Sequence, residues 1–179
     1  MFNSRLGCSS ISFRHQSLPE ALRTIESLGF EEIDLGALPG VCDHVPYDLD
    51  ADAVAAVTAE VVASGLRVRS VNGDIGDLNA LLDADAQSAR NRHLDALLAL
   101  AAGTGAKALV LPCGALGHDP VRSLDDDLDT IAAQLTAAKR RADVFGVELW
   151  TESLHFLRFC WNLERAEELA GRLAGSGVG

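Results

Sequence analysis

Aromatic and basic residues are both scarce in this sequence. Aromatic side chains make up 5% of its 179 residues, and 15 basic residues stand against 26 acidic ones, which gives a formal net charge of −11. A negative surface repels phosphate backbones and anionic membrane surfaces, and no basic stretch with interleaved aromatics occurs. No apolar run approaches the length of a membrane span. We therefore expect neither nucleic acid nor a membrane as a partner.

Paired cysteine motifs are also missing. The four cysteines, Cys8, Cys42, Cys113 and Cys160, are widely scattered, and no CxxC motif occurs. In a chain of this size that distribution favours reduced thiols over a disulfide framework. The N-terminal residues lack the apolar run of a signal peptide. We therefore expect a cytoplasmic protein.

What the sequence does contain is a regular alternation of short apolar segments and amphipathic helices. The expected strands are residues 6–13, 30–38, 66–71, 106–111 and 147–152, and the helices that follow them are residues 17–28, 50–64, 87–102, 123–145 and 162–173. Local signals support several helix starts: Ser17 with Glu20, and Ser123 with Asp126, have capping-box spacing, and Asn162 is a favourable N-cap. Five such units indicate a parallel sheet with helical crossovers.

Two architectures fit this alternation. One is a complete, doubly wound sheet of the flavodoxin type with strand order 2-1-3-4-5, and the other is a partial TIM barrel with five parallel strands in sequential order and outer helices. Residues 177–179 follow the fifth helix where a sixth strand is due. We therefore expect one domain over residues 1–179, truncated before strand six of an eight-strand barrel.

In both folds, ligands bind at the carboxyl ends of the strands, so polar residues there are the candidates. They are Ser9, Ser12, Arg14, His15, Cys42, Asp43, His44, Asn72, Asp74, Cys113, His118, Glu152 and His155. Glu152 at the end of the fifth strand could ligate a divalent cation and remove a proton next to a carbonyl; a structural acid paired with an arginine is the alternative. His155 could donate to a substrate hydroxyl or be an ordinary loop histidine.

Several other polar residues have plain structural explanations. Cys42 and His44 have the spacing of half a zinc site, but no second half follows. Asp125, Asp126 and Asp127 open a helix, where negative charge suits the helix dipole. Asp74 and Asp77 are typical turn residues.

Four segments resemble the sugar phosphate isomerase/epimerase superfamily, the xylose isomerase-like TIM barrels. They are Leu6-Gly7-Cys8-Ser9-Ser10, Gly29-Phe30-Glu31-Glu32-Ile33-Asp34-Leu35, Gly65-Leu66-Arg67-Val68 and Val147-Glu148-Leu149-Trp150-Thr151-Glu152. The resemblance implies that Glu152 binds a divalent metal and acts as acid and base on the carbon next to the carbonyl. It further implies that His155 contacts substrate. The family's remaining ligands belong to strands six to eight, which have no counterpart here. The endonuclease IV branch has metal-binding histidines where this sequence has Asn72 and Cys113.

From these observations we predict part of a sugar or sugar phosphate isomerase or epimerase. Glu152 is the predicted catalytic residue and metal ligand, and His155, Asn72, His15 and Cys113 are the predicted substrate-binding residues. The resemblance favours Mn²⁺, with Mg²⁺, Co²⁺ and Zn²⁺ as alternatives, and leaves self-association open. With one carboxylate ligand, the 179-residue chain is expected to bind metal weakly. A complete flavodoxin-like binding domain without catalysis is the competing hypothesis, and an endonuclease IV-like metallohydrolase is a third.

Overall fold

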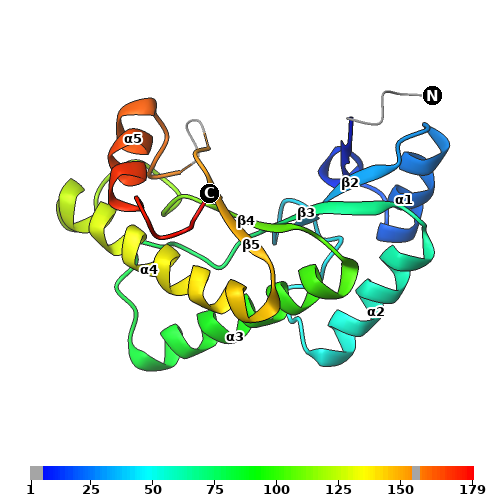
Figure 1. The fold of residues 1–179 in the computed structure, drawn as a ribbon, viewed down its shortest axis with the longest axis horizontal. Helices are drawn as coiled ribbons and strands as arrows, with labels where there is room; N and C mark the ends of the chain where they lie inside the picture. Colours follow the sequence, from blue (N-terminus) through cyan, green and yellow to red (C-terminus); the bar gives the residue numbers. More distant parts are fainter. Residues whose placement is uncertain (1–5, 155–157) are drawn as a thin grey trace. The chain divides into compact units, whose positions relative to one another are not determined.

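The fold of the chain is given by a computed structural model that describes residues 6–154 and 158–179. Five strands and five α-helices alternate along these residues (Figure 1). Within them, no helix combines the length and apolarity needed to cross a membrane.

The strands form one sheet in the order in which they occur in the sequence. They are β1 (Cys8–Ser9), β2 (Glu32–Ala37), β3 (Arg67–Gly73), β4 (Ala108–Pro112) and β5 (Glu148–Glu152), and the sheet is parallel. The sequential order β1-β2-β3-β4-β5 is that of a TIM barrel. The prediction of a partial barrel is therefore confirmed, and the flavodoxin-like order 2-1-3-4-5 is wrong.

The helices with local start signals begin where those signals predict, whereas the helix expected from residue 87 begins at Ala84. They are α1 (Leu18–Ser27), α2 (Ala51–Ala63), α3 (Ala84–Thr104), α4 (Leu124–Phe145) and α5 (Leu163–Arg172). Glu20 accepts a hydrogen bond from the Ser17 N–H at 2.9 Å, Ser123 Oγ accepts one from the Asp126 N–H at 3.1 Å, and Asn162 Oδ1 accepts one from the Arg165 N–H at 3.0 Å. Each bond satisfies a main-chain donor of a helix start that has no partner within the helix.

The structure differs from the sequence prediction at two strands. The expected strand 6–13 is only the two residues of β1, followed by a 3₁₀ helix, η1 (Ser10–Phe13). Ser10 is fully buried there, and its hydroxyl accepts the Gly36 N–H at 2.9 Å, so a side chain takes the place of a strand partner. Asn72, expected in a loop, lies within β3 opposite Gly36 of β2.

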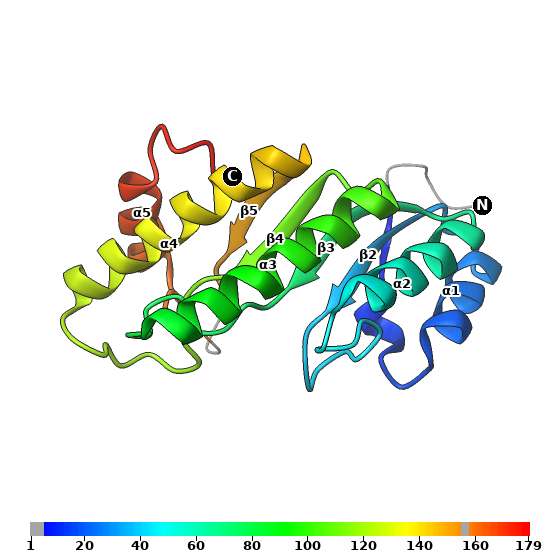
Figure 2. The same ribbon diagram turned by 90° about the horizontal axis from the view of Figure 1, so that it is seen from below.

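The chain divides into two compact units. The first comprises residues 1–74 and 95–109, and the second comprises residues 75–94 and 110–179. In the first unit α1 and α2 lie side by side (Figure 2), and the fully buried residues Ile25, Ile33 and Leu35 contribute to its core. At Gly36 a Cβ atom would lie 2.7 Å from Ile11 Cγ1 and 2.9 Å from Cys42 Sγ, so no larger residue fits.

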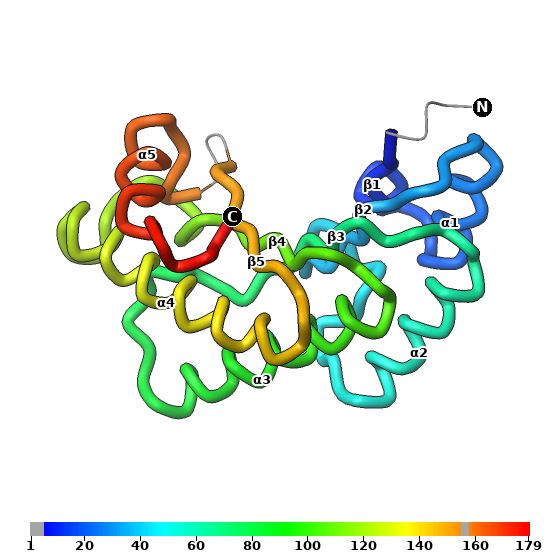
Figure 3. The backbone as a smooth tube through the Cα atoms, in the orientation of Figure 1, coloured from blue at the N-terminus to red at the C-terminus, as the bar shows by residue number. Residues whose placement is uncertain are grey.

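In the second unit α4 packs against both β5 and α5. The core includes the fully buried side chains of Leu128, Ile131, Leu149 and Phe159. The C-terminal residues return to β5 (Figure 3): the Gly179 N–H donates to the Leu149 carbonyl at 2.9 Å, and the Thr151 N–H donates to the Gly179 carbonyl at 2.9 Å. Two bonds that bracket one residue in this way are the pattern of parallel strands.

Candidate functional site

Glu152 is the last residue of β5, at the carboxyl end of the sheet. Side chains alternate along a strand, so Trp150 and Glu152 lie on one face and Leu149 and Thr151 lie on the other. Leu149 is fully buried and α4 packs on β5, whereas Trp150 is 42% exposed. Glu152 is therefore on the face turned away from α4. In a barrel that face is the inner one, where a catalytic carboxylate would act.

Cys113 lies next to Glu152 through the main chain. It directly follows β4, and its N–H donates to the Glu152 carbonyl at 3.1 Å. The Cys113 side chain points toward Thr151 and not toward the Glu152 side chain, because Cys113 Sγ lies 3.1 Å from Thr151 Oγ1. Thr151 and Glu152 alternate along β5, so the Cys113 thiol and the Glu152 carboxylate are on opposite faces of the sheet.

The Cys113 thiol also hydrogen-bonds the side chain of Cys160, from the loop after β5. This bond holds the pKa of Cys113 below its usual value, against the opposing effect of burial. The same bond and burial raise the pKa of Cys160. The pairing of two cysteines that are far apart in the sequence was not predicted.

Buried ionic and amide groups fasten the loops around the end of β4. Asp127, in the first turn of α4, is 0% exposed, and its Oδ2 accepts hydrogen bonds from Asn79 Nδ2 at 2.8 Å and from the Val121 N–H at 2.7 Å. Arg122 Nε lies 3.4 Å from Asp127 Oδ1. Asn79 Oδ1 in turn accepts the Ala115 N–H at 2.7 Å. One buried carboxylate thus organises the loop that follows β4.

The hydrogen bonds to Asp127 favour its ionised form. Burial by itself would raise its pKa, but the hydrogen bonds from Asn79 and from the Val121 and Arg122 main chains, with the charge of Arg122, lower the pKa below its usual value. The sequence contained a signal for this residue. Asp127 follows Leu124 by three positions and precedes Ile131 by four, which places a charge on the buried face of the helix.

A second set of contacts joins the loop after β5 to the loop after β4. Arg158 Nη1 donates to the Gly114 carbonyl at 3.2 Å and lies 3.9 Å from Asp77 Oδ1. The Phe159 N–H donates to the Ala115 carbonyl at 2.9 Å. At Gly114, where φ is 82°, a Cβ atom would lie 2.6 Å from Phe159 Cβ. We call Asp77, Asn79, Asp127 and Arg158 the loop framework. Sequence reasoning did not group these residues, because the contacts between them join distant segments, Asn79 with Asp127 and Asp77 with Arg158.

In the first unit, Asn72 shares a strand face with Ser70, two residues earlier. Ser70 Oγ donates to Asp34 Oδ1 at 2.7 Å, and Ser9 Oγ donates to Asp34 Oδ2 at 3.1 Å. The structure therefore places Asn72 on the polar face that carries Asp34. His15 is elsewhere: it is exposed and lines a surface pocket with residues of α1, among them Glu20 and Arg23.

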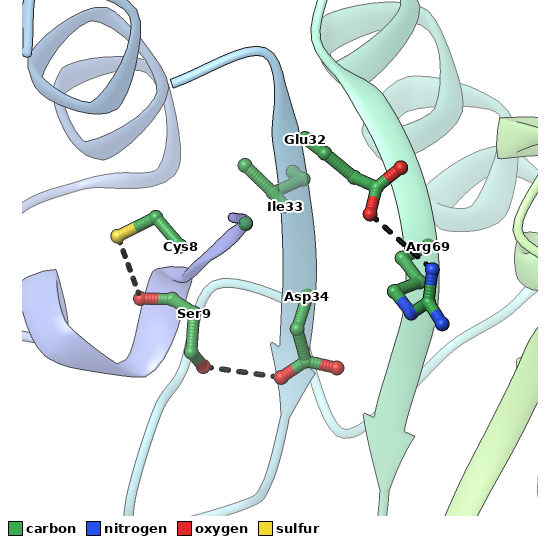
Figure 4. Close-up of a pocket in the computed structure, with 7 residues that line it drawn as sticks. Cys8, Ser9, Glu32, Ile33, Asp34 and Arg69 are labelled. Carbon is green, nitrogen blue, oxygen red and sulfur yellow. Dashed lines mark hydrogen bonds and ion pairs between the residues drawn. The ribbon is translucent and has the colours of Figure 1, made fainter. Parts of the chain in front are cut away.

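A cavity of about 570 Å³ opens on the polar face of the first unit. Its lining includes Ser9, Glu32, Asp34 and Arg69. Figure 4 shows Asp34 turned toward the Ser9 hydroxyl and Glu32 turned toward Arg69. Glu32 and Asp34 belong to the first half of β2, whereas ligands of parallel sheets bind beyond the carboxyl ends. The location argues against this cavity as the catalytic site.

The Cys42 and His44 pair is a satisfied structural contact. His44 is buried, with Nε2 at 3.2 Å from the Gln16 carbonyl and Nδ1 at 3.3 Å from Cys42 Sγ. A carbonyl only accepts, so Nε2 carries the proton and Nδ1 accepts from the Cys42 thiol. Across residues 6–154 and 158–179, no group of three or more potential His, Cys, Asp or Glu ligands occurs. His155, the remaining predicted substrate contact, lies outside the described residues.

No protein-family model and no curated protein matches the sequence, but solved structures match its fold. The IOLI protein with a bound zinc atom has a TM-score of 0.73 and 16% identity, over 97% of this chain and 60% of that one. The 3-keto-D-glucoside 4-epimerase YcjR from E. coli has a TM-score of 0.69 and 18% identity, over 96% and 65%. A xylose isomerase-like TIM barrel protein from Mycobacterium smegmatis, in complex with magnesium, has a TM-score of 0.69 and 13% identity, over 100% and 65%.

These matches establish the fold. The chain has five strand–helix units in the arrangement of a xylose isomerase-like TIM barrel, and it spans 60–65% of the length of these three structures. Proteins with the same fold include epimerases, a dehydratase and an AP endonuclease.

Proposed function

We propose that this chain belongs to an isomerase or epimerase of sugars or sugar phosphates in which Glu152 transfers a proton at the carbon next to a carbonyl. The observation that carries the proposal is the position of Glu152: the last residue of β5, on the face away from α4, in a fold that two epimerases share. Ligands of this fold bind at that end of the strands. A carboxylate is a suitable general base for such a proton once the developing enediolate is stabilised.

The neighbouring residues would position Glu152 in this reaction. Cys113 holds the Glu152 carbonyl, and the loop framework holds the loop after β4 that carries Cys113. A fixed main chain keeps the carboxylate within hydrogen-bonding reach of one carbon of the substrate. Asn72 and His155 remain predicted substrate contacts.

A divalent metal is the proposed cofactor, with Mn²⁺ first and Mg²⁺, Co²⁺ and Zn²⁺ as alternatives. Structures of this fold contain zinc or magnesium, and a bound divalent ion would polarise the substrate carbonyl. Glu152 offers one oxygen ligand, but the described residues contain no cluster of three potential ligands. These residues therefore do not make a complete metal site, and the proposed proton transfer uses Glu152 alone.

Phosphodiester cleavage is the second candidate, because an AP endonuclease from Brucella melitensis has the same fold. The formal net charge of −11 disfavours it, since a polyanionic substrate would be repelled. We therefore propose a small neutral or singly phosphorylated sugar as the substrate.

The test is turnover by the protein as its gene encodes it. Purified protein with Mn²⁺ is assayed on a panel of aldoses, ketoses and their phosphates, alongside Glu152→Gln and Glu148→Gln. Glu148 is the matched control because it lies on the same strand face, four residues earlier. We expect Glu152→Gln to lower kcat by at least ~100-fold, the size of a general-base contribution, and Glu148→Gln to keep wild-type activity. Equal activity of wild type and Glu152→Gln would overturn the proposal, as would cleavage of abasic DNA without sugar turnover.

A further inference from the structure

Cys113 and Cys160 are the two cysteines of the second unit, and they lie next to each other. Cys113 follows β4 and Cys160 lies in the loop after β5. The Cys160 N–H also donates to the Cys113 carbonyl at 3.4 Å. A main-chain bond of this kind spaces two residues like neighbouring strands, with Cα atoms about 5 Å apart. That spacing falls within the range of about 4.4–6.8 Å that disulfides require.

The surrounding hydrogen bonds fix the positions of both cysteines. The Thr151 hydroxyl donates to the Leu111 carbonyl at 3.0 Å, so the contact of 3.1 Å between Thr151 Oγ1 and Cys113 Sγ has Cys113 as its donor. Ser153 donates to the carbonyl of Cys160, which fixes the main chain of the second cysteine. These contacts, with the main-chain bond between the two residues, hold Cys113 and Cys160 beside each other.

A small oxidant has a route to one of the two sulfur atoms. Cys113 lines a cavity of about 650 Å³ together with Thr151, Ser153 and the α5 residues Ala166 and Leu169. Cys160 is 0% exposed and does not line the cavity. Oxidation therefore begins at Cys113, and Cys160 reacts only with its neighbour.

We propose that Cys113 and Cys160 are an oxidative modification site, where a hydroperoxide forms a reversible disulfide between the end of β4 and the loop after β5. In the first step the Cys113 sulfur attacks one peroxide oxygen, the O–O bond breaks, water leaves and Cys113 becomes a sulfenic acid. In the second step the Cys160 sulfur attacks the Cys113 sulfur, and the sulfenic oxygen leaves as water. Two thiols and one hydrogen peroxide thus give one disulfide and two waters, and a small-molecule thiol reverses the change.

The disulfide would lie one hydrogen bond from the Glu152 main chain, because the Cys113 N–H donates to the Glu152 carbonyl. It would also join two loops that the loop framework already holds. The inference does not rest on the proposed function, since the bond itself is the readout.

Peptide mapping tests the proposal, because each cysteine falls in a different tryptic peptide. Cys113 is in peptide 108–122, Cys160 in 159–165, Cys8 in 6–14 and Cys42 in 24–67. The folded protein is treated with one equivalent of hydrogen peroxide, alkylated in denaturant and digested. We expect two alkylated cysteines, Cys8 and Cys42, and a linked species of peptides 108–122 and 159–165 that dithiothreitol separates. The melting temperature should rise on oxidation and return on reduction.

Two controls separate the folded geometry from general thiol chemistry. Protein oxidised in urea should lose the preference for this pair, and Cys42→Ala should keep it, because Cys42 contacts His44 instead. The proposal is overturned if the folded wild type retains four alkylated cysteines. It is equally overturned if Cys113 accumulates as a sulfinic acid, or if the main disulfide involves Cys8 or Cys42. None of these outcomes depends on the folding of a variant.

Discussion

In the first unit Asp34 is half-buried and accepts hydrogen bonds from the hydroxyls of Ser9 and Ser70. In the second unit Asp127 is fully buried and is held by Asn79, a main-chain N–H and the charge of Arg122. The partners of Asp34 are uncharged hydroxyls of neighbouring strands. The arrangement around Asp127 places an ionic group under a loop at the carboxyl end of the sheet. The comparison shows that the fully buried carboxylate of the two belongs to the unit that also contains Glu152.

Removal of Asp127 should have the largest effect on stability. Asp127→Ala removes the ionic partner of Arg122 and leaves Asn79 and the Val121 N–H without their acceptor, and each buried donor left unsatisfied costs about 1–3 kcal/mol. Asp125→Ala is the matched control: Asp125 pairs with Arg172 but is 83% exposed, and such pairs contribute about 0–1 kcal/mol. Urea unfolding measures both. Equal losses in the two variants would show that the loop framework is no more stabilising than a surface pair.

The contribution of Asp127 should depend on pH in one direction. Its pKa is lower in the folded protein than in the unfolded chain, so its stabilisation is complete above the unfolded pKa of about 3.9. It is lost as the pH falls through the lower folded pKa. The difference in unfolding free energy between wild type and Asp127→Asn should therefore be constant from pH 5 to 7 and shrink below about pH 4. A difference that grows on acidification would contradict the account.

His44 gives the corresponding test in the first unit, with a smaller expected effect. His44→Ala removes the partner of the Cys42 thiol and of the Gln16 carbonyl, and each lost buried hydrogen bond costs about 1–3 kcal/mol. Cys42→Ser keeps a donor for His44 and should cost less. Elemental analysis should give the same zinc content for the wild type and for His44→Ala. One zinc per wild-type chain that is absent from His44→Ala would instead show that Cys42 and His44 form a metal site.

The cavity beside Glu32 should matter least. Arg69 is largely exposed where it lies 3.6 Å from Glu32, so Arg69→Ala should change the unfolding free energy by less than about 1 kcal/mol. It should also leave sugar turnover unchanged, because the cavity lies along the first half of β2 and away from the carboxyl ends. A loss of turnover comparable to that of Glu152→Gln would move the candidate site to this cavity.

The features that the sequence predicted correctly are local or periodic. Ser17 with Glu20 and Ser123 with Asp126 mark helix starts within four residues, and the alternation of strands and helices predicts the sheet. β1 was predicted too long because Ser10 caps the Gly36 N–H, a contact across 26 residues. The Asn79–Asp127 and Cys113–Cys160 contacts join segments separated by more than 40 residues, and no spacing rule reports them.

In the candidate site, the sequence predicted the position of Glu152 correctly but not the positions of Asn72 and the Cys113 side chain. Glu152 lies at the strand end that its position after an apolar run predicts. Asn72 was placed in a loop, yet it lies in β3, and the Cys113 thiol lies on the face opposite to the Glu152 carboxylate. Strand length decided the first outcome, because β3 extends to Gly73, and strand phase decided the second, because successive side chains of a strand lie on opposite faces. Their roles in substrate binding, with those of His15 and His155, stay predictions.

The central claim, that Glu152 moves a proton next to a carbonyl, can be measured without waiting for full turnover. Substrate sugars are incubated with the protein and Mn²⁺ in deuterium oxide, and NMR follows the signal of the hydrogen on the carbon next to the carbonyl. The account predicts deuterium incorporation at that carbon with wild type and Glu148→Gln, and incorporation at least ~100-fold slower with Glu152→Gln. Exchange at the same rate with Glu152→Gln would contradict it.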